Sequence, residues 1–442
     1  MKISKQLLGV AGATGLLSVG MADTAFAATP DETAFILNSF LFLIGGFLVM
    51  FMAAGFCMLE VGMVRAKNAA TICVKNIGLY SIAGLMYYLI GYNLMYNGVG
   101  DTGGYFGIPS PWAADLSGLI EDGAYVGDNA SYAPASDWFF QMVFCATAAS
   151  IVSGTVAERV KLWPFFIFVA ILTGVMYPIT GSWQWGGGWL SEAGFSDFAG
   201  STLVHSVGGW AALVGAILIG ARAGKYGPDG AVNPMPGSSL PLATLGTFIL
   251  WLGWFGFNGG SQLAAGTAAD IDAVATIFGN TNIAAAAGCV AAMLLSQVFY
   301  GKVDLTFALN GALAGLVSIT AEPLTPSFGM AAIIGAIGGV LVVLSVPVLD
   351  KMKVDDVVGA IPVHLVAGIW GTMAVPITND GTSFAVQALG VGAIGAFTVV
   401  AALVFWLVLQ LTVGLRASEE DELGGLDQSE LGLEAYPEFG RG

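Results

Sequence analysis

"STLVHSVGGWAALVG", residues 201–215, is a run of small and apolar residues with a single histidine at position 205. Such a run can lie inside a membrane, where an ionisable side chain costs free energy and therefore marks a site or a pathway. The chain contains only one other histidine, His364. The surroundings of the two histidines repeat, because "VHSVGG" begins at residue 204 and "VHLVAG" begins at residue 363.

The repeat extends to an aspartate upstream of each histidine. Asp197 precedes His205 by eight residues, and Asp356 precedes His364 by the same spacing. At an α-helical rise of ~1.5 Å per residue, each imidazole lies ~12 Å below its aspartate, near the middle of a ~30 Å hydrocarbon core. We therefore expect the two rings to approach the membrane midplane from opposite sides. Pro362 marks a kink or a late helix start in the second copy.

The composition fixes the protein class. The chain has 442 residues, of which 56% are hydrophobic and only 10% are charged, too few charges for a soluble protein of this size. The sequence predicts an all-α membrane protein with eleven transmembrane helices, built as an inverted repeat of five plus five helices and one C-terminal helix. The predicted helices are centred near residues 48, 82, 147, 172, 210, 250, 288, 313, 339, 367 and 400.

The lysines and arginines predict the orientation. Apart from Lys75, those of the mature chain fall in alternate connections or in the tail, and residues 97–135 contain none. The positive-inside rule places the N-terminus outside and the C-terminus in the cytoplasm of a plasma (inner) membrane. Of the thirty acidic residues, five lie in that loop and eight beyond Ser418, so the net charge of −16 supports no conclusion about a charged partner. We expect membrane lipids and no nucleic acid as partners.

The sequence divides into three regions. Residues 1–27 read as a signal peptide, because Lys2 and Lys5 precede an apolar stretch from Leu7 to Val19, and the cleavage pattern Ala25-Phe26-Ala27 follows it; an uncleaved helix is the alternative. Residues 28–416 form the membrane domain, and residues 417–442 form an acidic cytoplasmic tail. The four cysteines lie in apolar runs and indicate neither a disulfide framework nor a metal site.

The histidine pair allows several kinds of chemistry. A histidine in a membrane can simply join two helices by a hydrogen bond worth about 0.6 kcal/mol. Two neutral imidazoles on different helices can also share a hydrogen bond, as a proton relay or as a polar lining for a small solute. A b-type haem between them is a competing possibility. No nucleotide-binding motif or other enzyme signature appears, so we expect neither an enzyme nor a cofactor.

Aromatic residues indicate a vestibule on the outer side. Phe144 lies in the third predicted helix, Trp185 follows the fourth, and Trp254, Phe257 and Ser261 lie at the outer end of the sixth. Aromatic faces attract cations, and a serine oxygen accepts a hydrogen bond from an N–H donor. Together they predict a site for a small cation, although an aromatic belt at the membrane surface gives a similar pattern.

Several segments resemble the ammonium transporter (Amt/Rh) family over essentially the full mature length. The resemblance implies a homotrimer whose subunits each contain a pore. The segments are "LEVGMVRAKN" (59–68), "VAERVKLWP" (156–164), "WGGGWL" (185–190), "DFAGSTLVHSVGG" (197–209), "GWFGFNGGS" (253–261) and "GAIPVHLVAGIWG" (359–371).

The resemblance also implies a role for each candidate residue. Trp185 and Ser261 would recruit ammonium on the outer side, and Phe144 and Phe257 would form a phenyl gate below them. The two histidines would be the twin histidines of the pore. Asp197 would be the structural acid needed for activity, while the residues alone leave open that it merely caps a helix.

The tail carries a further expectation. "GLDQSELGLEAYPEF" (425–439) is similar to the cytoplasmic segment through which the family couples its subunits and meets the PII signalling protein. Leu431 stands where family members often carry a histidine, and a solvated acidic tail is the alternative. The sequence thus predicts an ammonium transporter that deprotonates ammonium and conducts ammonia; an ammonium sensor that signals through its tail, or a bis-histidine haem protein, is the alternative.

Overall fold

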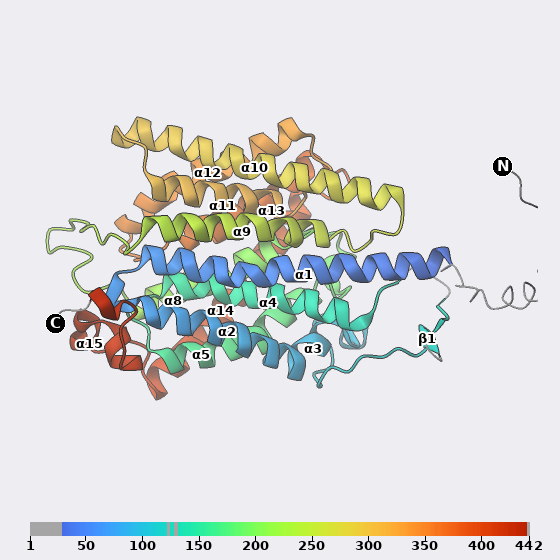
Figure 1. Ribbon diagram of the computed structural model, residues 1–442, viewed down its shortest axis with the longest axis horizontal. Helices are drawn as coiled ribbons and strands as arrows, with labels where there is room; N and C mark the ends of the chain where they lie inside the picture. Colours follow the sequence, from blue (N-terminus) through green and yellow to red (C-terminus); the bar gives the residue numbers. More distant parts are fainter. Residues whose placement is uncertain (1–28, 122–123, 128–130, 440–442) are drawn as a thin grey trace, which may run out of the picture.

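The computed structural model describes residues 29–121, 124–127 and 131–439 of the chain. The predicted signal peptide, residues 1–27, lies outside the described residues. The long helices run side by side along the long axis of the molecule (Figure 1). The loop of residues 97–133 lies at the end where the first helix begins, which we call the loop end, and residues 417–439 lie at the opposite end, the tail end (Figure 1).

The elements of the described chain are mostly α-helices. They are α1 (Pro30–Met63), α2 (Ala69–Met86), α3 (Tyr92–Tyr96), α4 (Pro134–Thr155), α5 (Leu162–Ile171), α6 (Tyr177–Ser182), α7 (Trp189–Glu192), α8 (Val207–Ile219), α9 (Leu240–Gly260), α10 (Ala268–Tyr300), α11 (Leu305–Ile319), α12 (Phe328–Lys351), α13 (Ala367–Ala374), α14 (Phe384–Thr412) and α15 (Glu419–Gly424).

Short helical segments of other types complete the fold. The π-helical segments are η2 (Tyr87–Gly91), η4 (Leu172–Met176), η5 (Ser201–Ser206), η6 (Ile361–Val366) and η8 (Asp427–Leu431). The 3₁₀ segments are η1 (Ala66–Asn68), η3 (Val99–Thr102), η7 (Val375–Ile377) and η9 (Pro437–Phe439). In the loop, β1 (Ile120–Glu121) and β2 (Ala124–Tyr125) form an antiparallel pair.

The helices fit a multi-pass membrane protein. Within the described residues, nine helical runs are long and apolar enough to cross a membrane. The shorter apolar runs Leu305–Ile319 and Ile361–Ile377 lie where two further crossings are predicted, near residues 313 and 367. The count of eleven crossings, the five-plus-five repeat and the outside position of the N-terminus stay predictions.

Polar side chains set where several membrane helices begin. Ser239, Ser327 and Ser383 accept hydrogen bonds from the first turns of α9, α12 and α14. Thr267 and Asp270 form a reciprocal capping box at the start of α10. Each cap satisfies N–H groups that have no partner inside the helix, and this fixes where the helix begins after the preceding connection.

Small residues bring the helices close together. A Cβ atom added to Gly246 on α9 would lie 2.3 Å from the backbone nitrogen of Leu59 on α1, so only glycine permits this contact. Because lipid tails are as apolar as the helices, close van der Waals packing of this kind is a main source of helix association in membranes.

The tail is packed against the tail end of the bundle. Asp427 is 1% exposed, and its carboxylate accepts hydrogen bonds from the backbone N–H groups of Ala70 and Thr71 at the start of α2. Leu426 is buried, and its N–H donates to Asn68 Oδ1. The alternative of a fully solvated tail is therefore wrong for Leu426 and Asp427, whereas Leu433 and Tyr436 are exposed.

Ion pairs join the connections at the tail end. Arg222 binds both oxygens of Asp355 through its guanidinium, at 2.8 and 2.9 Å, and lies 3.3 Å from Glu158. Arg65 pairs with Glu158 from the other side. Burial alone would raise the pKa of Asp355, but the hydrogen bonds and charge of Arg222 lower it to about 2. This cluster ties together connections that are far apart in the sequence.

Candidate functional site

The two histidines lie in direct contact at the centre of the bundle. His205, in η5, is fully buried, and His364, in η6, is 3% exposed. Their Nδ1 atoms are 3.2 Å apart, and their ring centroids are separated by 5.2 Å with an interplanar angle of 26°. One Nδ1 must therefore donate and the other accept, which requires opposite tautomers when both rings are neutral.

This contact does not suit the haem alternative. The nitrogens that face each other are at hydrogen-bond distance, so no space for an iron atom remains between them. His205 Nε2, on the other side of its ring, is buried and has no hydrogen-bond partner among the described residues. The pair therefore offers an unused polar atom in apolar surroundings, which a small hydrogen-bonding solute can meet.

Asp197 holds the backbone that carries His205. Its carboxylate accepts hydrogen bonds, at 2.8–3.1 Å, from the N–H groups of the four successive residues 200–203. Gly200, which precedes η5, has a φ of 108°, a conformation that favours glycine. Asp197 is thus a helix cap, and through the cap it sets the position of His205, two residues beyond the last capped N–H group.

Asp356 supports the backbone before the second histidine in a similar way, but with fewer hydrogen bonds. Asp356 Oδ2 accepts a hydrogen bond from the Ile361 N–H at 2.7 Å, and its Oδ1 accepts one from Thr155 Oγ1 at 3.0 Å. Pro362 stands in the first turn of η6, so the predicted late helix start is confirmed. Both histidines lie in π-helical segments that begin within two residues of a glycine with positive φ, Gly200 and Gly359. The α-helical rise assumed from the sequence was therefore wrong, because the aspartates cap the segments instead of continuing them.

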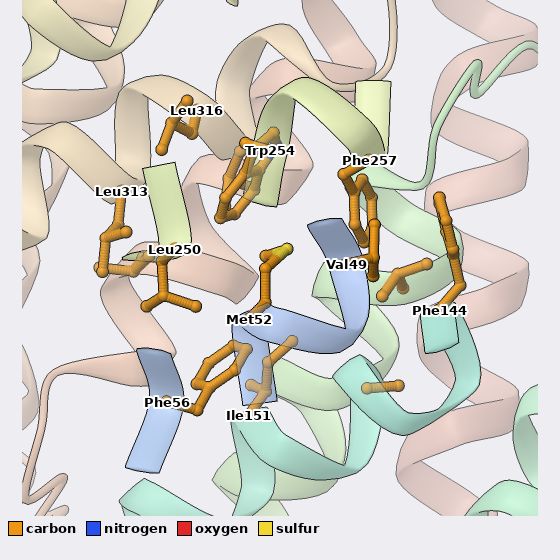
Figure 2. Packing of buried hydrophobic residues seen from close by; sticks show 14 of the residues in the cluster. Val49, Met52, Phe56, Phe144, Ile151, Leu250, Trp254, Phe257, Leu313 and Leu316 are labelled. Atoms are coloured by element: carbon orange, nitrogen blue, oxygen red, sulfur yellow. The ribbon is translucent and has the colours of Figure 1, made fainter. Parts of the chain in front are cut away.

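A column of aromatic rings leads from the histidines to the loop end. Phe257 lies 5.3 Å from His205, and Phe144 stacks on Phe257 at 4.0 Å with an interplanar angle of 23°. Figure 2 shows these two phenyl rings facing each other from α9 and α4. Trp185 follows, 6.2 Å from Phe144 and nearly perpendicular to it. The column closes the path between the loop end and the histidines with apolar faces.

A cavity of about 310 Å³ lies above this column, at the loop end. Trp185 and Ser261 both line this cavity. Ser261 Oγ donates to the Phe257 carbonyl at 2.8 Å, which leaves its lone pairs free to accept hydrogen bonds. The Trp185 indole nitrogen donates to the Asp197 carbonyl, which fixes the orientation of the ring.

Trp254 does not line this cavity, which we call the vestibule. It is fully buried, its ring stacks on His205 at 4.9 Å, and its indole N–H donates to Thr320 Oγ1. The sequence placed it at the outer end of α9 from its position alone. The structure instead turns it inward against the histidine, beside Met52 (Figure 2).

Other polar residues of the vestibule were missed by the sequence analysis. The tyrosine hydroxyl of Tyr92 donates to the carboxylate of Asp137, and the hydroxyl of Tyr96 is buried without a partner among the described residues. Tyr92 and Tyr96 are four residues apart in α3, which gives them a common face and was the one available signal. The further lining residues are Tyr132, Asp137, Gln141, Phe144, Phe198 and Leu263.

Comparison with known proteins gives one consistent result. A profile of the Ammonium Transporter Family matches residues 40–436. The chain is 40% identical to the ammonium transporter Amt2 of Archaeoglobus fulgidus, over 96% of this chain and 93% of that protein. It is also 40% identical to a putative ammonium transporter of Synechocystis sp., over 98% of this chain and 97% of that protein.

Solved structures share the fold. A structure titled Sensor Amt Protein superposes with a TM-score of 0.82 at 35% identity, and the match covers 90% of this chain and 99% of that one. Mep2 of Candida albicans superposes with a TM-score of 0.76 at 24% identity, with 93% and 92% covered.

Proposed function

The chain belongs to the ammonium transporter family, and from this membership and the geometry of its site we propose that it takes up ammonium by moving ammonia through the pore of the histidine pair. The observation that carries the proposal is the unbroken order of groups from the vestibule through two stacked phenyl rings to two hydrogen-bonded imidazoles. Each group acts on a different property of the ammonium ion.

Recruitment takes place in the vestibule. Ammonium donates a hydrogen bond to Ser261 Oγ and lies against the face of Trp185, where cation–π attraction contributes about 0.5–2 kcal/mol. The Asp137 carboxylate in the wall adds negative potential. These contacts replace part of the hydration shell before the ion reaches the phenyl rings.

Deprotonation follows at the Phe144–Phe257 gate. Entry of the intact ion into the apolar column costs several kcal/mol of desolvation, whereas ammonia is neutral and small. Potassium has a similar size but no proton to release, so it meets the full cost and is excluded. Selectivity therefore comes from the chemistry of the ion and not from the width of the pore.

The histidines then carry the polar part of the path. His205 Nε2 has no hydrogen-bond partner in the described part of the chain, and it offers ammonia a hydrogen bond in otherwise apolar surroundings. The shared proton between the two Nδ1 atoms gives the released proton a route through the same layer. Asp197 acts as a positioning residue, because it holds the backbone that carries His205.

The assembly and orientation belong to the same proposal. The loop end faces the outside and the tail end faces the cytoplasm of a plasma membrane, in contact with lipids. Three copies form a trimer in which each subunit has its own pore, and the PII signalling protein meets the packed tail. The placing of eight of the thirty acidic residues beyond Ser418 supports a tail that remains outside the membrane.

Ammonium pulses on proteoliposomes test the proposal. We expect wild-type protein to give an inward current and a rise of internal ammonium above that of protein-free liposomes, and H205A/H364A to lose the current. Wild-type protein that gives neither signal refutes transport. Wild-type uptake without current retains transport but refutes the proton route.

Sensing is a second candidate, which the packed tail favours. A tail that is bound to the start of α2 can report a change in the helices to a cytoplasmic partner. Ammonium binding without any uptake, measured by calorimetry and on the same proteoliposomes, would favour sensing over transport.

A further inference from the structure

Resting on the proposed function, we propose that Glu60 accepts the proton that passes the histidine pair and releases it toward the tail end. Glu60 lies on α1, three residues before the helix ends, and is only 1% exposed. It lies outside the aromatic column and the vestibule.

Glu60 and His364 line the same small cavity on the tail side of the histidine pair. The cavity measures about 10 Å³, and its wall also includes Phe56, Ile151, Asn310 and Val363. Phe56 and Ile151 lie side by side in Figure 2. A space of about 10–15 Å³ is enough for one water molecule. The cavity therefore allows a water-bridged hydrogen bond between the imidazole and the carboxylate.

One oxygen of Glu60 is unused. Ser153 Oγ donates to Oε2 at 2.7 Å, whereas Oε1 is buried and has no hydrogen-bond partner among the described residues. Buried carboxylate oxygens are normally satisfied, so an unpartnered one in a cavity beside a histidine needs an explanation. Reception of a proton from that cavity provides one.

A buried lysine completes the arrangement. Lys75, on α2, is 1% exposed, its Nζ donates to the Ser153 carbonyl at 2.7 Å, and it lies 4.6 Å from the centre of the Phe165 ring. Ser153 thus contacts both the lysine and the glutamate. Because the nearby positive charge compensates the carboxylate, Glu60 can remain ionised in apolar surroundings and ready to accept.

The proton moves from His364 to Glu60 in two transfers. A protonated His364 gives the proton on the ring nitrogen not used by His205 to the bridging water, and the water gives a proton to Glu60 Oε1. The imidazole becomes neutral and the carboxylate becomes a carboxylic acid. Lys75 then lacks its counter-charge, which favours release of the proton to water at the tail end. Ammonia that leaves the pore takes up a proton from the same water, so one ammonium ion is transferred overall.

A merely structural role for Glu60 makes a different prediction. A buried glutamate that only ties α1 to α4 would, when replaced, lower the amount of folded protein or all transport together. A proton acceptor would instead change the charge moved per ammonium taken up. This ratio is therefore the quantity to measure.

The experiment compares E60Q with wild type in proteoliposomes, with current and internal ammonium recorded for the same pulse. Glutamine keeps the shape and can still accept the Ser153 hydrogen bond, but it cannot take up a proton. At unchanged ammonia flux we expect the charge-to-ammonium ratio to fall about a hundredfold, because a positioned proton acceptor contributes at least about this factor to the rate of proton transfer. E60D, which keeps a carboxylate, should recover part of the ratio.

E322Q is the matched control. Glu322 is also buried, at 7% exposed, and accepts hydrogen bonds from Asn379 and from backbone N–H groups, but it does not line the cavity. Its replacement should leave the ratio unchanged. An unchanged ratio in folded E60Q, including a parallel fall of current and uptake, overturns the proposal.

Wild-type protein provides a test that does not depend on folding of a variant. A hydrophobic carbodiimide reacts with protonated carboxyl groups in apolar surroundings, and mass spectrometry then locates the adduct. Label on Glu60 that rises in step with loss of current supports the proposal, and loss of current without label on Glu60 overturns it. Wild-type uptake that moves no charge overturns this inference while transport stands, and absence of uptake removes both.

Discussion

Replacement of Asp197 by asparagine tests how strongly the cap supports the site. Asparagine has the same shape, but it offers one accepting oxygen and places an amide N–H₂ against backbone donors. Of the four N–H groups that the carboxylate now satisfies, two lose their acceptor. A buried donor left without a partner costs about 1–3 kcal/mol, so the free energy of unfolding should fall by about 2–6 kcal/mol.

Asp356, the aspartate eight residues before His364, provides the control. Asp356 accepts hydrogen bonds from one backbone N–H of η6 and from the hydroxyl of Thr155, and a hydroxyl can turn to donate or to accept. D356N should therefore lose about 0–3 kcal/mol, which is less than D197N loses. Unfolding in detergent micelles, titrated with denaturing detergent and followed by tryptophan fluorescence, measures both variants against wild type.

The ammonium current of the two variants provides a second test. In D197N that is still folded, His205 should lose its fixed distance to His364, so the current should fall more than in D356N. Equal stability losses in the two variants, or full current in folded D197N, would refute the reasoning that the cap positions the histidine.

Three further predictions concern other parts of the molecule. D137N removes a unit charge that stabilises an ion in the vestibule by about 1 kcal/mol, so the ammonium concentration for half-maximal current should rise about fivefold. E192Q, which lies outside the cavity, is the control. An unchanged half-maximal concentration in D137N contradicts this prediction. Because Arg222 depresses the pKa of Asp355 to about 2, the stability from this pair should be complete above pH ~4 and be lost as the pH falls toward 2, as followed by thermal unfolding. D355N should remove that dependence, and a wild-type stability that is flat over this range would contradict the assignment. D427A should free the tail for proteolysis at unchanged bundle stability, and protection equal to wild type would show that other contacts hold the tail.

The histidine pair shows what the sequence can reveal. Only two histidines occur, each with an aspartate eight residues upstream, and this pattern alone predicts that they approach each other in the membrane. It does not predict the π-helical backbone around them. That backbone depends on which N–H groups Asp197 satisfies and on the φ of Gly200, which are tertiary details.

The vestibule and the inner cavity show where sequence reasoning stops. Tyr92 and Asp137 meet across 45 positions, most of them in an irregular loop that has no periodicity to guide a prediction. Glu60 and Ser153 are 93 positions apart. In the sequence, Glu60 looks like an ordinary charged residue near the end of a helix, and nothing there indicates its contact with Ser153. Contacts of this kind are set by packing between helices, which hydrophobic periodicity does not encode.

The contact between Asp427 and the start of α2 also orders events in time. The N–H groups of Ala70 and Thr71 receive their acceptor from a residue about 356 positions further along the chain. Because α2 is synthesised before the tail, its first N–H groups have no carboxylate from Asp427 until the ribosome reaches that residue. Closure of the tail is therefore a late step of biogenesis, and it distinguishes a fully translated subunit from an incomplete one.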